Sequence, residues 1–249
     1  MSAVRDLTGG LRWHLRALLL RRRWRQTITH IAEWLATTRP ASQTLLLIGG
    51  SAGWMMSDVW LQRFKQIHLI DIDPLAPHLF RLNHGRALRA SGTHLNFIQM
   101  DGLAGLDALL AAHPEATIFF DNVLGQHVYR VHDFDQAEAD LKRVVGSLQG
   151  RDWGSVHDVF SGPSDPMKVP PQPQQVFEVT RTAEGLSVEG LRDTALHLRL
   201  LAQVGGKDEW MDHVTSGVFP VGTTGRLIAW PFRPEYAHWL YAGWHGAKD

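Results

Sequence analysis

The sequence predicts an α/β protein with a doubly wound, mostly parallel seven-stranded sheet, N-terminal helices and an antiparallel C-terminal strand pair. Three observations favour this class. Short, continuous apolar runs recur between residues 44 and 160, segments of helix length separate them, and four of the runs end in glycines or acids. Such runs are typical of parallel strands that are covered on both faces.

The first 40 residues are predicted to form a basic helical extension of two helices, with eight Arg against Asp6 and Glu33. In the first helix, leucines recur at helical spacing and can share one face, at Leu11, Leu15, Leu18 and Leu19. The second helix covers about residues 27–37 and places four side chains inward, Ile28, Ile31, Ala32 and Leu35. The run RRRWR at 21–25 fits either a solvated helix face or nucleic-acid binding.

Residues 41–160 are predicted to form the core of the sheet. The apolar runs give five strands, at about 44–48, 67–73, 95–102, 116–122 and 153–160. Helices are expected between them, at about 54–64, 75–90, 103–112 and 134–148. This alternation of strand and helix indicates parallel crossover connections.

Residues 161–249 are predicted to complete the same domain, so that 1–249 forms a single unit. A loop rich in Pro, Ser and Gln covers 161–175. Candidate strands follow at 176–181, 195–203 and 226–232, with a further aromatic segment at 236–244. We expect this part to close the sheet with antiparallel strands or to cap the site.

The composition excludes several classes of protein. The formal net charge is zero and the pI is about 7.3, so no overall field attracts nucleic acid or membranes. There is no Cys, which excludes disulfides and thiolate chemistry. No apolar stretch is long enough to span a membrane, and a cytoplasmic protein is expected. The fourteen His show no recognisable metal-ligand spacing, so no metal is expected.

The ends of the first four strands carry side chains that suit a nucleoside ligand. They are, in order, the turn Gly49, Gly50, Ser51 and Gly53, then Asp71 and Asp73, then Asp101, then Asp121 and Asn122. Ligands of open α/β sheets bind outside the carboxyl ends of the strands. Glycine permits close approach to the backbone, one carboxylate can accept ribose hydroxyls, and another can accept an exocyclic amine of a purine.

In their order and spacing, LLLIGGSAGW, IDIDP, QMDG and FFDNVLGQ resemble the class I S-adenosylmethionine-dependent methyltransferases, which have a Rossmann-like fold. The resemblance covers residues 44–160. It implies S-adenosylmethionine as cofactor and methyl transfer to an N or O atom of a small-molecule or peptide-like acceptor. It also implies a cofactor site of Gly49, Gly50, Ser51, Gly53, Asp71, Ile72, Asp101, Gly102, Asp121 and Asn122, with Asp71 on the ribose and Asp101 on the adenine.

Two positions depart from the family pattern, because Leu47 replaces an early acid and Ser51 replaces the middle glycine. Spermidine synthases also resemble LLLIGG followed by IDIDP and lack that acid, but they have Asp where this chain has Ala52. Aminopropyl transfer is therefore one alternative, and a binding protein without catalysis is another. A nicotinamide site would need glycines where this chain has Ser51 and Trp54.

Three residues are candidates for the chemical step, His127, His157 and Asp121. His157 lies near the end of the fifth strand, and the near-neutral pKa that is usual for histidine suits a general base if the side chain faces the cleft, in which case Asp158 faces away. His127 follows the fourth strand, and Asp212 with His213 could join the site if the tail caps it. The aromatic tail favours a small or peptide-like acceptor, with nucleic acid as the second option.

Overall fold

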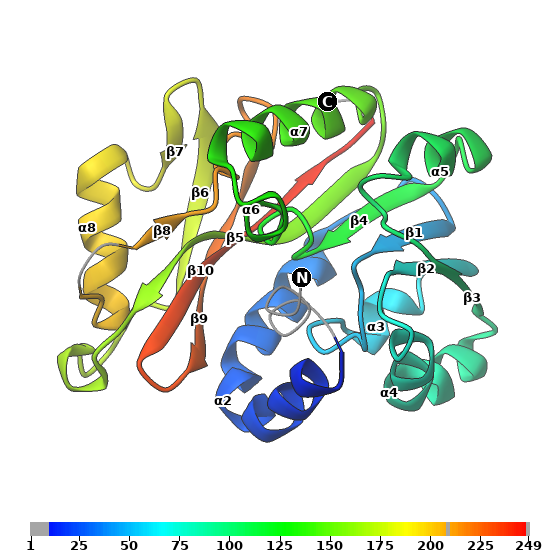
Figure 1. Cartoon of the computed structure of the whole chain (residues 1–249), viewed down its shortest axis with the longest axis horizontal. Helices are drawn as coiled ribbons and strands as arrows, with labels where there is room; N and C mark the ends of the chain where they lie inside the picture. The colour runs from blue at the N-terminus through cyan, green and yellow to red at the C-terminus, as the bar shows by residue number, and fades with distance from the viewer. Residues whose placement is uncertain (1–9, 208–209, 248–249) are drawn as a thin grey trace.

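The computed structural model describes residues 10–207 and 210–247, whose strands form one sheet (Figure 1). The strand order is β3-β2-β1-β4-β5-β10-β9-β6-β7, and β8 pairs with β5. Their bounds are β1 Thr44–Ile48, β2 Gln66–Asp71, β3 His94–Gln99, β4 Thr117–Asp121, β5 Trp153–Pro163, β6 Val176–Thr182, β7 Gly185–Ser187, β8 Met211–Asp212, β9 Thr224–Arg233 and β10 Tyr236–His245.

This topology confirms the predicted Rossmann-like class. Strands β1 to β5 pair in parallel, and β10 and β9 follow as an antiparallel pair next to β5. The chain runs outward from β1 to β3 and then returns to β4, so the strand order reverses between β1 and β4. The expected number of seven strands was wrong. Within the described residues the sheet has ten, because β6 and β7 extend it beyond β9 and β8 adds a short pairing to β5.

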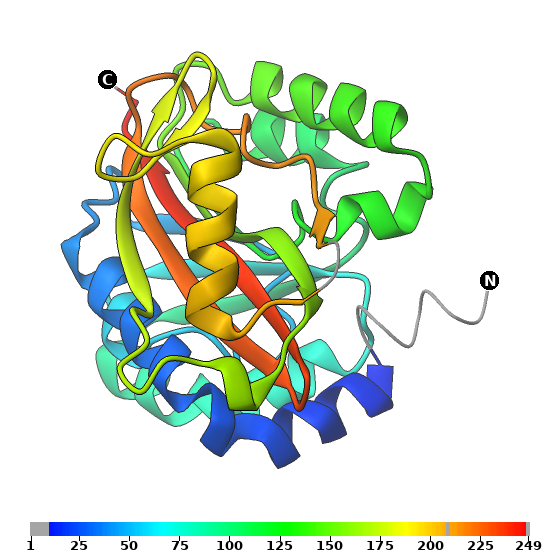
Figure 2. The same cartoon turned by 90° about the vertical axis from the view of Figure 1, so that its left-hand side faces the viewer.

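Helices cover both faces of the sheet. Buried side chains of α2, α3 and α4 form one apolar cluster, and those of α5, α7 and α8 join a second cluster on the other face. Figure 2 shows α8 running beside the antiparallel half of the sheet. The helix bounds are α2 Gly10–Thr37, α3 Asp58–Leu61, α4 Ala76–Ser91, α5 Leu106–Ala112, α6 His127–Val131, α7 Phe134–Ser147 and α8 Asp193–Val204, with a 3-10 turn at Pro166–Lys168.

A single helix, α2, replaces the two predicted N-terminal helices. Its 28 residues contain no Pro, and its buried stripe runs through His14, Trp24, Ile31 and Leu35. The predicted leucine face was wrong: Leu11, Leu15, Leu18 and Leu19 are 49–83% exposed. The buried face is instead selected by contacts with the sheet. No helix in the described ranges has the length and apolar character needed to cross a membrane.

Helix α2 is fixed to β9 by hydrogen bonds as well as by packing. The indole Nε1 of Trp24 donates to the Phe232 carbonyl at 2.9 Å, and the Thr27 hydroxyl donates to the Ala229 carbonyl at 2.8 Å. Both donors are buried, so these bonds satisfy groups that would otherwise destabilise the interface. The helix therefore lies along the antiparallel pair and reaches the carboxyl edge of the sheet.

Two further elements differ from the predictions. Residues 195–203 form most of helix α8 and not a strand, because Leu196 and Leu200 are buried at a spacing of four while Leu198 is 60% exposed. The helix ends at Gly205, which has a φ of 63°. The predicted helix over 54–64 shortens to the four residues of α3, after a series of turns.

Candidate active site

One cavity of about 390 Å³ lies at the carboxyl edge of the parallel strands, where the strand order reverses. It brings together nine of the ten residues predicted to bind the cofactor, Gly49, Gly50, Ser51, Asp71, Ile72, Asp101, Gly102, Asp121 and Asn122. Their convergence follows from the topology, because the ends of adjacent parallel strands meet at one edge. The cavity continues along the face of β9 and β10 that α2 covers.

The turn after β1 has backbone conformations that favour glycine. Gly49 has a φ of 74°, and Ser51 has a φ of 46° although it carries a side chain. A Cβ on Gly50 would lie 2.6 Å from Leu69 and 2.8 Å from Leu47, so this glycine lets the turn pack onto the strands beneath it. The turn is thus needed for close packing as well as for an open cavity.

Gly53 lies outside this cavity. A Cβ there would lie 2.3 Å from the His84 ring, and the Gly53 carbonyl accepts a hydrogen bond from Nε2 of His84 at 2.9 Å. The Nδ1 of the same ring contacts Asp58 at 2.6 Å. Gly53 therefore serves the packing of the turn against α4.

Asp71 and Asp121 place two carboxyl groups in the wall of the cavity. Each oxygen of Asp71 accepts one backbone N–H, from Ser51 at 2.8 Å and from Asp73 at 2.9 Å, which leaves further acceptor capacity on both oxygens. Burial raises the pKa of Asp71. Burial, and then the negative charge of Asp71, raise the pKa of Asp121 to about 8. Asp121 is therefore mostly protonated at neutral pH.

The second acid of IDIDP, Asp73, holds the start of α2. Its Oδ2 accepts hydrogen bonds from the Gly10 N–H at 2.7 Å and from Nε2 of His14 at 3.0 Å. The Nδ1 of His14 in turn accepts from the Trp54 indole at 3.2 Å, which places the ring proton on Nε2. Burial opposes ionisation of Asp73, but the hydrogen bonds from His14 and from backbone N–H groups lower its pKa to about 2.

We expect Asp73→Asn to destabilise the protein by about 2 kcal/mol at neutral pH, because the folded state favours the ionised carboxylate. A carboxyl whose pKa is lowered on folding stabilises above its unfolded value of about 4 and loses this contribution as the pH falls toward 2. Urea unfolding of both proteins at neutral pH and at about pH 3 measures the change. The exposed Glu115→Gln is the charge-matched control, and a difference that does not shrink in acid would contradict the assignment.

Asp101, the acid expected to bind a purine amine, pairs with Arg130 of α6 across the cavity. Its Oδ1 also accepts the backbone N–H groups of Leu103 and Ala104. Burial opposes ionisation of Asp101, but the hydrogen bond and charge of Arg130 and the backbone N–H groups of Ala104 and Leu103 together lower its pKa below the ordinary value, so the group remains ionised. A ligand that uses Asp101 must therefore share it with Arg130 or displace that guanidinium.

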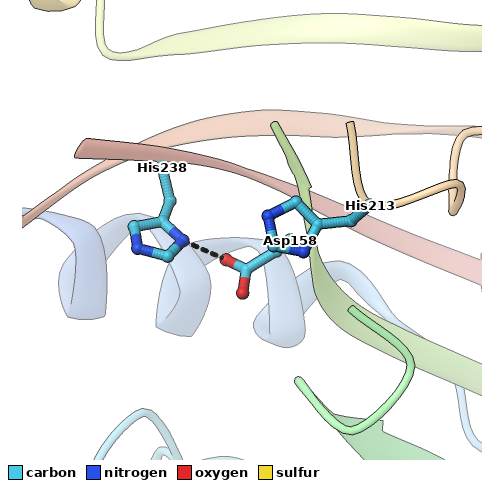
Figure 3. A group of neighbouring side chains, drawn as sticks. All are labelled: Asp158, His213 and His238. Atoms are coloured by element: carbon cyan, nitrogen blue, oxygen red, sulfur yellow. Dashed lines mark hydrogen bonds and ion pairs between the residues drawn. The ribbon is translucent and has the colours of Figure 1, made fainter. Parts of the chain in front are cut away.

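Behind the cavity wall lies a polar network that sequence reasoning missed, in which Asn122, Gln126 and His238 of the wall surround the fully buried Asp158. Asp158 of β5 accepts hydrogen bonds on Oδ2 from Asn122 at 3.0 Å and Gln126 at 2.6 Å. Its Oδ1 contacts Nδ1 of His238 on β10 at 2.8 Å (Figure 3). Burial raises the pKa of Asp158, but the charges and hydrogen bonds around it, chiefly from His238, hold it well below its ordinary value. Asn122 therefore positions Asp158.

The structure does not place either predicted histidine base in the cavity. His157 is fully buried and stacks on Phe219 on the other face of β5, where burial lowers its pKa to about 4. The expected orientation was wrong, because Asp158 faces the cavity side and His157 faces away from it. His127 contacts Asp140 of α7 at 2.9 Å and also lies outside the cavity.

The predicted pair Asp212 and His213 separates. Asp212 is exposed, whereas His213 is buried close to Asp158 and His238 (Figure 3). The Nδ1 of His213 bonds to the Gly125 carbonyl at 2.7 Å, and its Nε2 contacts the Ser161 hydroxyl at 2.8 Å. His213 is thus a support of the network.

The rest of the cavity wall is largely aromatic and basic and comes from distant parts of the chain. Helix α2 and the turn after β1 supply Trp13, Arg16 and Trp54, α6 supplies Tyr129 and Arg130, and the β9–β10 hairpin supplies Trp230, Phe232, Arg233, Tyr236 and His238. A signal for part of this set was present in YAHWLYAGWH, where Tyr236, His238 and Leu240 alternate on one face.

No protein-family model matches the sequence, and a search of curated proteins finds no significant match. Solved structures with a similar fold include an O-methyltransferase family protein from Burkholderia thailandensis, at 15% identity and a TM-score of 0.40, covering 94% of this chain. This chain spans 59% of that protein's length. Magnesium protoporphyrin IX methyltransferase from Synechocystis PCC 6803 with bound S-adenosylmethionine gives 14% identity and a TM-score of 0.43 over 97% of this chain and 88% of its own.

A geranyl diphosphate methyltransferase in complex with S-adenosylmethionine is also similar, at 13% identity and a TM-score of 0.39 over 97% of this chain and 93% of its own. The strand order of this chain, with its reversal between β1 and β4, is that of a Rossmann-like fold.

Proposed function

We propose that this protein transfers a methyl group from S-adenosylmethionine to an N or O atom of a small-molecule or peptide-like acceptor. The observation that carries the proposal is the convergence of four consecutive strand ends on one cavity, with Asp71, Asp101 and Asp121 in its wall. At about 390 Å³ the cavity is in the range of small-molecule sites.

The residues present fit the donor. Asp71 keeps free acceptor capacity for two ribose hydroxyls, and Asp101 can accept from an adenine amine if Arg130 moves. Within the described chain, the buried hydroxyl of Ser51 has no hydrogen-bond partner, as expected for a group that a ligand completes. The turn of Gly49 and Gly50 would approach the methionine part, and Asp121 would lie near the sulfonium. The donor supplies an electrophilic methyl group, and this chain supplies binding and orientation.

The aromatic wall supports a small acceptor better than nucleic acid. Trp13, Trp230 and Phe232 give the cavity apolar faces next to the donor half. Trp24, the aromatic residue within RRRWR, is buried between α2 and the sheet, so it cannot stack on bases. The arginines of that run therefore offer charge without the stacking that single-stranded binding uses.

Aminopropyl transfer finds no comparable support. Ala52, at the position where spermidine synthases have an acid, is fully buried in an apolar cluster. A carboxylate in that apolar cluster would be costly to bury.

Calorimetry tests the proposal directly. We expect the purified protein to bind S-adenosylmethionine and S-adenosylhomocysteine, and to transfer label from the methyl group to an acceptor in a mixture of small phenols, amines and carboxylic acids. Failure to bind either nucleoside would overturn the proposal. Binding without transfer to any class of acceptor would favour the non-catalytic alternative.

Donor binding should also release a proton near neutral pH. Asp121 has a pKa of about 8 in the free protein, so it is mostly neutral there, and a nearby sulfonium cation favours its ionised form. S-Adenosylhomocysteine lacks that charge and should release fewer protons. Calorimetry in two buffers of different ionisation enthalpy measures the difference between the ligands. Asp121→Asn should abolish it, and equal release by both ligands would contradict the placement of Asp121.

A further inference from the structure

The buried side chains of Asp158, His213 and His238 lie close together (Figure 3), and they differ in how fully their polar atoms are hydrogen-bonded. Both nitrogens of His213 are hydrogen-bonded, to Gly125 and Ser161, and Asp158 is bonded through both oxygens. Within the described ranges, Nε2 of His238 is buried and has no hydrogen-bond partner. An unpartnered buried nitrogen requires an explanation, and here its residue lines the cavity.

The contact with Asp158 determines the proton of His238. An ionised carboxylate can only accept, so the Nδ1 of His238, at 2.8 Å, carries a proton and donates it. In the neutral ring Nε2 is then a free acceptor. The carboxylate of Asp158 is held in place by hydrogen bonds from Asn122 and Gln126, and the Asp158 N–H donates to Oδ1 of Asn122. The held carboxylate in turn fixes the orientation of the His238 ring.

Three aromatic rings surround His238, in tilted or edge-on orientations. Its ring centroid lies 5.0 Å from that of Trp230, 4.9 Å from Phe232 and 5.4 Å from Tyr236. The indole Nε1 of Trp230 is a second buried group with no hydrogen-bond partner among the residues described. The wall therefore offers a free acceptor on His238 and a free donor on Trp230, which together match a hydroxyl group, since a hydroxyl both donates and accepts.

We propose that His238, oriented by Asp158, is the general base of this site and that the acceptor is an aromatic hydroxyl compound. The assignment rests on the proposed function. The Nε2 of His238 takes the hydroxyl proton, the oxygen uses its electron pair to bond the methyl carbon of the donor, and the carbon–sulfur bond breaks with its electrons remaining on sulfur. Asp158 stabilises the resulting imidazolium, which then returns the proton to water.

The charged and titratable groups around His238 come from several elements. Asp158 lies on β5, His213 follows β8 at a ring distance of 6.3 Å, and Tyr236 lies on β10 itself. Arg16 of α2 lies over the Phe232 ring at 5.6 Å and faces this part of the wall. Among the residues that the structure describes, the negative charge in direct contact with His238 is that of Asp158.

The test uses p-nitrophenol, whose ionised form absorbs in the visible, and needs no donor. Wild-type protein should bind it and favour the phenolate about tenfold or more over the ratio in free solution at the same pH. His238→Gln should lose this shift, and Trp230→Phe should weaken binding about tenfold. Tyr241→Phe is the matched control, because that hydroxyl is also buried on β10 and unpartnered within the described chain, but lies outside the cavity.

A second measurement uses the wild type alone, so its result does not depend on whether the variants fold. Nitrogen-15 NMR should show His238 protonated at Nδ1 and free at Nε2, and the opposite tautomer would overturn the proposal. Absence of p-nitrophenol binding to the wild type, or the same phenolate shift in His238→Gln, would also overturn it. A shift that disappears on treatment with a chelator would overturn it in favour of a metal held by the three side chains. These measurements omit the donor. They can therefore contradict the role of His238 while the donor still binds, and they can support that role even if the donor does not bind.

Discussion

Asp71→Ala is expected to weaken binding of S-adenosylmethionine by about 100-fold or more. Two charge-assisted hydrogen bonds to ribose hydroxyls would be lost, and these contribute about 3 kcal/mol together. The carboxylate also accepts the N–H groups of Ser51 and Asp73, so its removal loosens the turn that faces the ligand. The affinity of the variant, measured by calorimetry, gives the loss directly.

Two controls separate a lost contact from a disturbed turn. Asp71→Asn keeps one oxygen for the backbone and should lose less affinity than the alanine variant, while Glu115→Gln should bind as the wild type does. Both variants of Asp71 should unfold cooperatively in urea. Unchanged donor affinity in folded Asp71→Ala would place the nucleoside elsewhere and remove the basis of the proposed function.

Gly53→Ala is expected to destabilise the protein by about 3 kcal/mol. The residue has a φ of 69°, which costs an alanine about 1 kcal/mol, and its Cβ would meet the His84 ring at 2.3 Å. That ring is held on both sides, by Asp58 and by the Gly53 carbonyl, so it cannot move away without losing a hydrogen bond. Overpacking of this kind typically costs a further 1–3 kcal/mol, roughly.

Gly92→Ala is the matched control for this change. Gly92 ends α4 with a φ of 74°, but among the described residues its Cβ would meet no heavy atom within 4 Å. It should therefore lose about 1 kcal/mol from the backbone alone. Urea unfolding of the two variants measures the difference, and equal losses would show that contact with His84 is unimportant.

The parallel half of the fold could be predicted because each of its strands leaves a local signal. TLLLI at 44–48 is buried on both faces in the structure, as its continuous apolar run indicates. Asp71, Asp101 and Asp121 follow such runs, and the geometry of parallel strands then brings them together without further information.

The acceptor half could not be predicted because it depends on pairing between distant segments. His238 reaches Asp158 because β10 pairs antiparallel with β5, 80 residues away in sequence. The leucines of 195–203 fit both a strand and a helix locally, and tertiary packing selects the helix. The exposed leucines of α2 could not be recognised from local sequence either, since the buried face of this helix is set by its contact with β9 and not by the spacing of leucines.

The three indoles on the cavity wall have a practical consequence. Trp13, Trp54 and Trp230 come from a helix, a turn and a strand, yet they surround one space. A flat ligand entering that space would contact the indoles that line it and change their ultraviolet emission. Occupancy can therefore be followed by intrinsic fluorescence on the native chain, and single Trp→Phe replacements would tell which end of the chamber a given compound occupies.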